Sequence, residues 1–333
     1  MRRVFSVLLF VTLLVASLAS GRSPALARRK PAPSPSPSPT GTPTPSPTPS
    51  LSPAQRLERL RDELEALARA APGRLGASVF DVTTGARASV RGDDAFPLAG
   101  TAKLAVALAA FRRADQHRLD LNALVLVTAA DLRHGSAIAL AHPRGNVYLS
   151  NWMLIEAMLA NGDNTATDVL LGELGGPDAL QTFLDKLGTH GFRYRKSEAD
   201  AYADAHAGRT FARGADNAGT PSGVADLLAE LVQVHYLSLG STNEMLSMLL
   251  ATQSGSEGLA AGLPPGASLA HEAGSGYPVD GVTGATNDAG ILTLPDGRRI
   301  VIVAFLASAR GDAAERNAVL ARVARAAYDA FGP

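Results

Sequence analysis

Two β-rich regions lie far apart in this sequence, and a long run of helical patterns separates them. The first consists of Ala77–Val82 and Ala86–Val90, joined by a Thr-Gly turn, which predicts a hairpin. The second consists of Gly281–Leu294 and Arg299–Leu306, joined by a Pro-Asp-Gly turn. Strands that lie far apart in a sequence can pair with one another in a single sheet around one core. The sequence therefore predicts a mixed α/β (α+β) fold with an antiparallel sheet formed from both ends.

The stretch between these regions has apolar residues at helical spacing. A first helix is predicted to start near Ser52, and a last one covers Ala313–Phe331. Five further helices are expected between the strands, over Thr101–Phe111, Leu149–Ala160, Asn164–Leu174, Pro177–Leu187 and Gly223–Val234. The α/β part then covers about 54–98 and 260–333, with helices packed on the sheet, and an all-α domain at about 99–259 is inserted.

The first residues have the pattern of an export signal. Two arginines precede an apolar run over Val4–Ala19, and small residues lead to Ala27. We predict a signal peptide over residues 1–27, and hence a protein of the periplasm, the cell envelope or the medium. An uncleaved membrane anchor is the alternative, which we disfavour because the run is shorter than the about 20 residues that span a bilayer.

Residues 28–53 consist largely of proline alternating with serine or threonine. Proline at this density favours an extended polyproline conformation, so the segment predicts a semi-rigid spacer of roughly 60 Å. A folded domain follows over 54–333. No second long apolar run occurs there, so no transmembrane segment is expected in the mature chain.

The composition excludes several kinds of function. The formal net charge is +0, so there is no basic excess of the kind that binds nucleic acid. The chain has no cysteine, which removes disulfides, thiolate catalysis and cysteine-based zinc sites. Apolar residues make up 46% of the chain, enough for a large core.

The order of these elements resembles that of the class A serine β-lactamases, within the penicillin-recognising serine hydrolases. The resemblance covers about Leu57–Phe331. Four local stretches carry it: Ala95-Phe96-Pro97-Leu98-Ala99, Asp163-Asn164-Thr165-Ala166, Leu174-Gly175-Gly176-Pro177 and Asn287-Asp288-Ala289-Gly290-Ile291. The resemblance implies a β-lactamase/transpeptidase-like fold and a site built from three motifs, S-x-x-K, S-D-N and K-T-G.

The first motif is represented by Gly100-Thr101-Ala102-Lys103, so the lysine is present and the nucleophilic serine is absent. Thr101 lies about 100° further around the helix, so we do not expect its hydroxyl to replace the serine. We expect it to cap the start of the helix instead.

The second motif is represented by Gly162-Asp163-Asn164, which lacks the hydroxyl that relays a proton. For Asp163 and Asn164 we favour a structural role, in which their side chains hydrogen-bond to the backbone of neighbouring loops. Ligand binding is the alternative. The third motif is represented by Glu272-Ala273-Gly274, in which a carboxylate replaces the cation that would hold the substrate carboxylate. A unit charge pair at 4 Å is worth roughly 4 kcal/mol near a protein surface, so this reversal opposes β-lactam binding.

The family's deacylating glutamate corresponds to Glu198, counted without gaps from Leu187. A solvated loop carboxylate is the alternative for this residue. The loop also holds Asp200, Asp204 and His206, which are metal-ligand types, but such a run is more often solvated. We therefore predict no metal site and no cofactor.

Lys103 needs a partner, because a buried and unpaired ammonium is expensive. We expect it to pair with Glu272 across the cleft. The motif-equivalent positions are Gly100, Lys103, Gly162, Asn164, Glu198 and Glu272, and the expected ligand-binding residues are Lys103, Asp163, Asn164, Glu272 and Gly274.

These losses predict a catalytically inactive pseudoenzyme that acts as a binding or interaction module at the cell envelope. The resemblance implies a cell-wall peptide or a β-lactam-like small molecule as its partner. The alternative is a β-lactamase or related hydrolase of cyclic amides with weak or non-standard activity, which would use Lys103, Glu198 or a water molecule.

Overall fold

The computed structural model describes residues 51–206 and 217–332. The predicted signal peptide and nearly all of the predicted spacer lie outside these residues. The chain divides into Met1–Pro49 and Ser50–Pro333, and every element below belongs to the second unit. Among the described residues, no helix combines the length and the apolar character that crossing a membrane requires.

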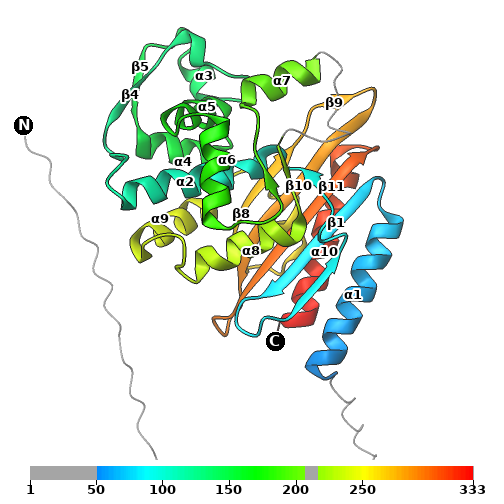
Figure 1. The fold of residues 1–333 in the computed structure, drawn as a ribbon. Helices are drawn as coiled ribbons and strands as arrows, with labels where there is room; N and C mark the ends of the chain where they lie inside the picture. Colours follow the sequence, from blue (N-terminus) through cyan, green and yellow to red (C-terminus); the bar gives the residue numbers. More distant parts are fainter. Residues whose placement is uncertain (1–50, 207–216, 333) are drawn as a thin grey trace, which may run out of the picture. The chain divides into compact units, whose positions relative to one another are not determined.

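Both ends of this unit contribute to one six-stranded antiparallel sheet (Figure 1). The strand order is β2-β1-β11-β10-β8, and β9 pairs with β10. The strands are β1 (Arg74–Asp81), β2 (Arg87–Val90), β8 (Ser268–Ser275), β9 (Pro278–Val279), β10 (Val282–Thr293) and β11 (Arg299–Ala309). Arg74 lies opposite Ala307 and Asp81 opposite Ile300, which confirms a sheet shared by the two ends.

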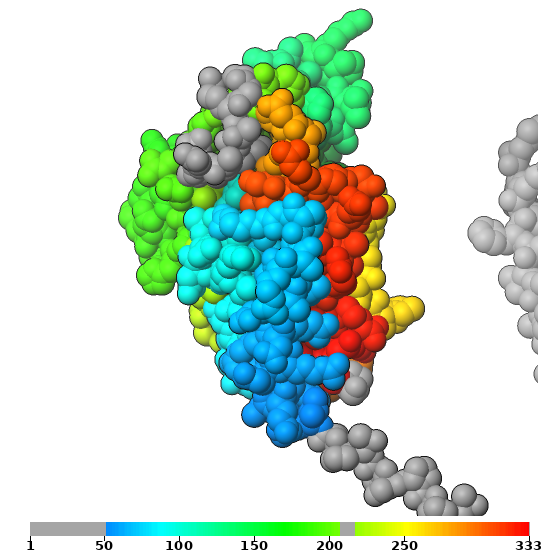
Figure 2. Space-filling model, turned by 90° about the vertical axis from the view of Figure 1, so that its right-hand side faces the viewer, coloured from blue at the N-terminus to red at the C-terminus, as the bar shows by residue number. Residues whose placement is uncertain are grey.

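Two helices cover one face of the sheet. α1 (Pro53–Ala70) begins at a Ser52 capping box with proline in its first turn, as predicted, and α10 (Ala313–Phe331) begins at a capping box of Asp312. Figure 2 shows α1, in blue, beside α10, in red. Their apolar stripes and one face of the strands form the second core, which includes Leu64, Ile302 and Leu320.

The helical part packs against the opposite face of the sheet, and its buried residues form the first core. Its α-helices are α2 (Lys103–Asp115), α3 (Ala137–Ala141), α4 (Asn151–Asn161), α5 (Asn164–Glu173), α6 (Pro177–Leu187), α7 (Glu198–His206), α8 (Pro221–Val232) and α9 (Leu239–Leu250). Three 3₁₀ turns complete the helices, η1 (Ala99–Ala102), η2 (Ala129–Asp131) and η3 (Leu259–Gly262).

The helical part also contains short strands. β3 (Phe96–Pro97), β6 (Phe192–Arg193) and β7 (Ala218–Gly219) form a small sheet, and β4 (Leu124–Val127) pairs with β5 (Val147–Ser150). The predicted helix start at Leu149 is therefore wrong. Leu149 and Ser150 belong to β5. The Ser150 side chain accepts a hydrogen bond from the Met153 amide and so caps α4, which begins at Asn151, two residues after the predicted start.

Candidate functional site

The first motif lies in η1, directly before α2. Gly100 packs against the backbone of β8, and no side chain separates them. A Cβ atom on Gly100 would lie 2.7 Å from the Ala273 carbonyl oxygen and 2.9 Å from the Gly274 Cα. A Cβ on Gly274 would in turn overlap the backbone of Gly100. Since atoms in protein interiors do not approach so closely, any side chain at position 100 requires β8 or η1 to move.

Thr101 does not supply the missing nucleophile. Its side chain is buried, and its hydroxyl donates a hydrogen bond of 2.6 Å to the Leu98 carbonyl. The expected N-cap role is wrong, because Thr101 lies within η1 and acts as a donor to the preceding turn. The residue that precedes α2 is Ala102, which has no capping side chain.

Lys103 is buried and meets the second motif. Its Nζ donates a 2.9 Å hydrogen bond to the Gly162 carbonyl oxygen. Gly162 ends α4 in the left-handed conformation, at φ 65°, which glycine adopts without strain. A Cβ on Gly162 would lie 3.9 Å from the Lys103 Nζ, so the position of the absent serine faces the ammonium.

Glu272 lies in β8 and is fully buried. Within the described residues, neither of its carboxyl oxygens has a hydrogen-bond partner. Burial raises the pKa of Glu272 well above 4.5, and the positive charge of Lys103 opposes this rise. The nearby carboxylates of Asp288 and Glu198 raise the pKa further. Burial in a medium of low polarity therefore favours the protonated form of Glu272.

The expected ion pair between Lys103 and Glu272 is not a direct contact. The Lys103 ammonium is hydrogen-bonded to the Gly162 carbonyl, and the Glu272 oxygens accept from no described group. The positive charge of Lys103 still opposes the rise in the pKa of Glu272. The hydrogen-bond partner of the Lys103 ammonium is therefore the backbone carbonyl of Gly162, directly after α4, and not the carboxylate of Glu272 that we predicted.

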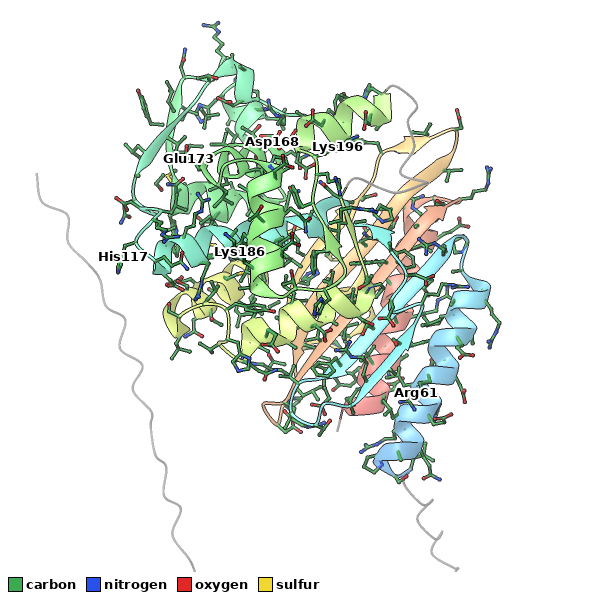
Figure 3. The ribbon with its side chains drawn as sticks, viewed as in Figure 1. Arg61, His117, Asp168, Glu173, Lys186 and Lys196 are labelled. Atoms are coloured by element: carbon green, nitrogen blue, oxygen red, sulfur yellow. The ribbon has the colours of Figure 1, made fainter. Side chains whose placement is uncertain are left out.

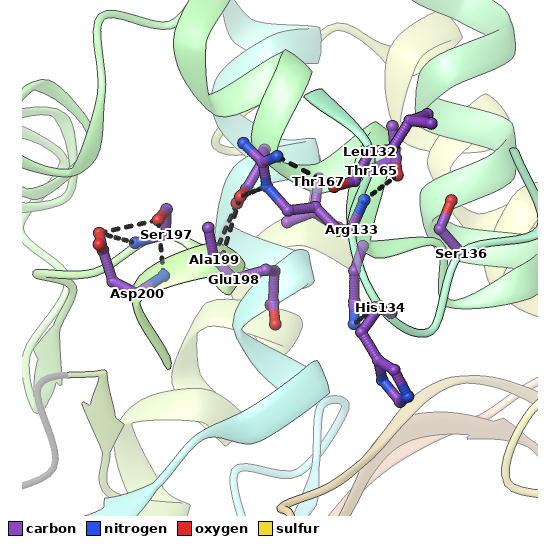
Figure 4. Close-up of polar contacts among 12 residues, drawn as sticks. Leu132, Arg133, His134, Ser136, Thr165, Thr167, Ser197, Glu198, Ala199 and Asp200 are labelled. Carbon is purple, nitrogen blue, oxygen red and sulfur yellow. Dashed lines mark hydrogen bonds and ion pairs between the residues drawn. The ribbon is translucent and has the colours of Figure 1, made fainter. Parts of the chain in front are cut away.

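Glu198 is the first residue of α7 and lies within the electrostatic reach of Lys103. Burial raises the pKa of Glu198, Lys103 lowers it, and Asp168 raises it, with a net upward shift. Figure 4 shows the Glu198 side chain pointing away from Arg133. Lys103, Glu198 and Glu272 therefore form one electrostatically coupled cluster of an ammonium and two carboxyl groups.

Asp168, which is not among the residues predicted from the sequence, holds the start of α7. Its carboxylate accepts hydrogen bonds from the Glu198 amide at 2.7 Å and the Ala199 amide at 3.1 Å. It also pairs with the Arg133 Nε at 2.6 Å. Figure 3 labels Asp168, which belongs to α5, and Lys196, which precedes α7. The spacing could have indicated this residue, because Asp168 lies one helical turn after Asn164 and therefore on the same side of α5 as the second motif.

A cluster of aromatic rings, also missed from the sequence, joins three segments near Glu198. His134 stacks on Tyr202 of α7, with ring centroids 4.9 Å apart. Tyr277, in the turn between β8 and β9, lies 5.2 Å from Tyr202 and 5.7 Å from His134. Burial and the Glu198 charge raise the pKa of Tyr277. Such ring pairs pack firmly, and they link α7 to the end of β8.

Asp163 and Asn164 tie loops together. Asp163 is fully buried and caps α5 through the Ala166 amide, and its carboxylate also accepts from the Ser136 hydroxyl and the Ile138 amide. Asn164 donates to the His134 carbonyl at 2.9 Å. A ligand of Asp163 would have to replace these bonds.

Two acidic residues of the α7 segment have partners within or just before the helix. Asp200 accepts a hydrogen bond from the Ser197 hydroxyl, and Asp204 pairs with Lys196. In the part of the chain that the structure describes, no three His, Cys, Asp or Glu residues are grouped so that they could hold a metal ion.

Comparisons with known proteins agree with this arrangement. Residues 59–331 match the family described as the beta-lactamase enzyme family. The extended-spectrum beta-lactamase PER-1 of Pseudomonas aeruginosa is 27% identical over 271 residues, covering 81% of this chain and 86% of that protein.

Solved structures give the same result. A beta-lactamase from Chitinophaga pinensis is 28% identical with a TM-score of 0.76, over 81% of this chain and 98% of its own. An ancestral class A beta-lactamase is 32% identical with a TM-score of 0.74, over 82% of this chain and 100% of its own. The match over residues 59–331 and the likeness to these solved structures show that this chain belongs to the beta-lactamase enzyme family and has the class A fold.

Proposed function

We propose that this chain is a catalytically inactive member of the family that acts as a binding or interaction module at the cell envelope. One observation carries the proposal: the backbone of β8 occupies the space that a side chain on Gly100 would need. Acyl transfer requires a nucleophile there, and the loss of a nucleophile alone costs on the order of 10⁶ in turnover where catalytic residues act as a unit.

The charge of the site supports the same proposal. Glu272 replaces a cation, and its carboxyl group is buried, with burial raising its pKa and the charge of Lys103 opposing that rise. A ligand carboxylate placed there would meet the Glu272 carboxyl group in place of that cation, while the Lys103 ammonium donates to the Gly162 carbonyl and keeps its charge. We propose a cell-wall peptide or a β-lactam-like molecule as the partner, by analogy with the relatives, with contacts that differ from those of a substrate.

The test is turnover and covalent labelling. We expect no hydrolysis of a chromogenic cephalosporin and no adduct with a fluorescent penicillin, with the PER-1 enzyme as the positive control. The variant Gly100→Ser is expected to remain inactive, because Gly162 and Glu272 still lack the groups of the second and third motifs. Turnover above the uncatalysed rate, or a stable adduct on the wild-type chain, would refute the proposal.

The same variant tests the steric argument. We expect Gly100→Ser to lose about 1–3 kcal/mol of unfolding free energy, the usual cost of overpacking. The control is Gly172→Ser on α5, where an added Cβ would meet no atom within 4 Å, and its stability should change by about 0.5 kcal/mol or less. Equal stability of the two variants in urea unfolding would contradict the closed space at Gly100.

A hydrolase with a non-covalent route is the second candidate. The electrostatic coupling of Lys103 and Glu198 favours it, since a carboxylate of raised pKa beside an ammonium is a candidate general base for a water molecule. If the wild-type chain shows slow turnover, this reading requires that Glu198→Gln and Lys103→Met each remove it. Turnover that survives both changes would exclude this route.

The exported location is part of the proposal. It rests on residues 1–27, which lie outside the described residues, and on the relatives being beta-lactamases. Expression of the full chain in a bacterial host should yield a protein in the periplasm or medium whose N-terminus follows Ala27 or lies near Ala19. An intact N-terminus on a protein in the cytoplasm would contradict export.

A further inference from the structure

A groove of about 220 Å³ lies between α9 and the strands β8, β10 and β11. Figure 1 shows α9 beside β8, and the two elements are in contact. Pockets for drug-sized molecules have roughly 300–1,000 Å³, so this groove suits a smaller ligand. It shares no residue with the candidate functional site. We call it the α9 groove.

The strand residues of the α9 groove all lie on one face of the sheet. Ala270 of β8 lies opposite Ile291 of β10, and Thr293 of β10 lies opposite Arg299 of β11. Residues directly opposite each other, and residues two apart on one strand, share a face. Since Ala270 and Ile291 belong to the first core, this is the face that the helical part covers.

The helix contributes one stripe of side chains. Its lining residues are Asn243, Leu246, Ser247 and Leu250, which have the spacing of a single helix face. Seven residues at 1.5 Å each make this stripe about 10 Å long. Leu246 is half-buried and Leu250 is 51% exposed. The α9 groove is therefore elongated, and leucine and isoleucine side chains line its apolar part.

The polar part of the α9 groove contains a guanidinium group. One nitrogen of Arg299, Nη1, donates a 3.2 Å hydrogen bond to the Val232 carbonyl at the end of α8. A guanidinium has five N–H groups, so others stay available. The side chains of Asn243, Ser247 and Thr293 make no hydrogen bond to any group in 51–206 or 217–332. These four residues can donate to an anion without giving up another partner.

The charge of the α9 groove is positive. Among the described residues, no carboxyl group lines it. Glu244 of α9 is exposed and lies about 100° around the helix from Asn243. On β8, Glu272 is two residues beyond Ala270 on the same face, and its burial favours the protonated form.

The other carboxylates on the bordering elements have partners. Asp226 and Glu230 of α8 pair with Arg87 and His235. Asp288 of β10 pairs with His271. At the start of α9, Asp115 accepts from the hydroxyls of Ser238 and Ser241. The charge of Arg299 is therefore not cancelled by a carboxylate within the groove.

We infer that the α9 groove binds a short-chain monocarboxylic acid, with its carboxylate on the Arg299 guanidinium and its alkyl chain against Leu246 and Ile291. A guanidinium holds a carboxylate through two parallel hydrogen bonds. Inorganic phosphate would satisfy the guanidinium but leave the apolar side chains uncovered. A chain of six carbons matches the length of the α9 stripe.

The test is a titration with hexanoate, followed by saturation-transfer NMR of the ligand. The chain without residues 1–27 is used, because both cores lie within the compact unit that begins at Ser50. We expect a Kd on the order of 1 mM, as befits so small a ligand. Hexanamide, which lacks the charge, and acetate, which lacks the alkyl chain, should each bind at least fivefold more weakly.

Two variants assign the binding to the α9 groove. Arg299→Gln should weaken hexanoate binding at least fivefold and bind hexanoate and hexanamide equally. Ser247→Trp places a large side chain in the groove from an exposed position and should weaken hexanoate binding at least tenfold. The matched control is Arg322→Gln on α10, an exposed arginine that also donates to a helix carbonyl, and it should bind as the wild type does.

Four outcomes would overturn the inference. They are the absence of saturation transfer to hexanoate, equal binding of hexanoate and hexanamide to the wild type, equal binding of hexanoate and acetate, and hexanoate binding that survives both variants. The third result would show a site for small anions only. Urea unfolding midpoints close to the wild-type value show that the variants fold.

Discussion

Gly100 and Gly274 allow the backbone of η1 to touch the backbone of β8. Either residue with a Cβ would force the two segments apart, so the pair of glycines and the closed space depend on each other. Ala99, directly before Gly100, has a φ of 46°, a left-handed conformation that costs a non-glycine residue on the order of 1 kcal/mol. The chain therefore keeps a strained turn at this site although the nucleophile is absent.

Glu272 is the residue whose chemistry is most altered by its surroundings. Its pKa is raised in the folded chain, so above pH 4.5 the folded state binds more protons than the unfolded state. The wild-type chain must then lose stability as pH rises towards the folded pKa. A neutral side chain of the same shape does not titrate and avoids this loss.

We expect Glu272→Gln to become progressively more stable than the wild type as pH rises above 4.5, by about 1.4 kcal/mol per pH unit within the window. Urea unfolding at pH 5, 7 and 9 measures the difference. The control is Glu244→Gln on α9, an exposed residue, whose stability should follow the wild type at each pH. Parallel pH curves for Glu272→Gln and the wild type would show that the buried carboxyl is not protonated preferentially in the fold.

At the scale of elements, α7 is held at its start by a carboxylate from another helix. Asp168 of α5 accepts from the first two amides of α7, where the partial positive charge of the helix end adds to the hydrogen bonds. The ring stack of His134 and Tyr202 is a second attachment. Because Glu198 is the first residue of α7, its position near Lys103 depends on both attachments.

Removal of the first attachment should loosen α7 alone. We expect Asp168→Ala to speed hydrogen exchange of the amides in residues 198–206 by about fivefold to tenfold, since a lost helix cap costs about 1 kcal/mol or somewhat more. Asp312→Ala, which removes the cap of α10, is the control and should leave exchange in α7 unchanged. Unchanged exchange in α7 of the Asp168 variant would mean that the aromatic cluster alone holds this helix.

At the scale of the whole folded unit, one sheet supplies both cores. Along β11, Val301 and Val303 enter the first core, while Ile302 and Ala304 enter the second. Asn287 of β10 also donates to the Pro97 and Leu98 carbonyls, which joins the sheet to the segment leading into η1. Neither core is complete without these strands, so the two should unfold together.

A substitution in the second core tests this coupling. Leu320→Ala on α10 should cost about 2–5 kcal/mol, because it leaves a cavity in the second core. Trp152, the chain's single tryptophan, packs on Phe111 of the first core and reports its unfolding. We expect the fluorescence and circular dichroism midpoints to shift together, with exposed Leu239→Ala unchanged. A tryptophan transition that stays at the wild-type midpoint would show that the cores unfold independently.

The sequence predicted those parts of the fold in which local pattern is strong. The hairpin of β1 and β2, the pairing of β10 with β11, and the bounds of α6 and α10 agree with the structure. The short strands β3 to β7 and β9 were missed, because runs of two to four residues show no clear periodicity. The helical start at Leu149 failed for the same reason, since two residues of β5 continue into the apolar pattern of α4.

By itself the sequence determined which groups the site contains: a lysine at 103, no serine at 100 or 162, and a glutamate at 272. The identity of each residue and its position within the motif are enough to establish these points. Only the tertiary structure decided what those groups contact. It bonded Lys103 to a carbonyl, left Glu272 without a hydrogen-bond partner among the described residues, and pressed η1 onto β8. Contacts between residues 59 or more positions apart depend on how the layers pack, which no local spacing encodes.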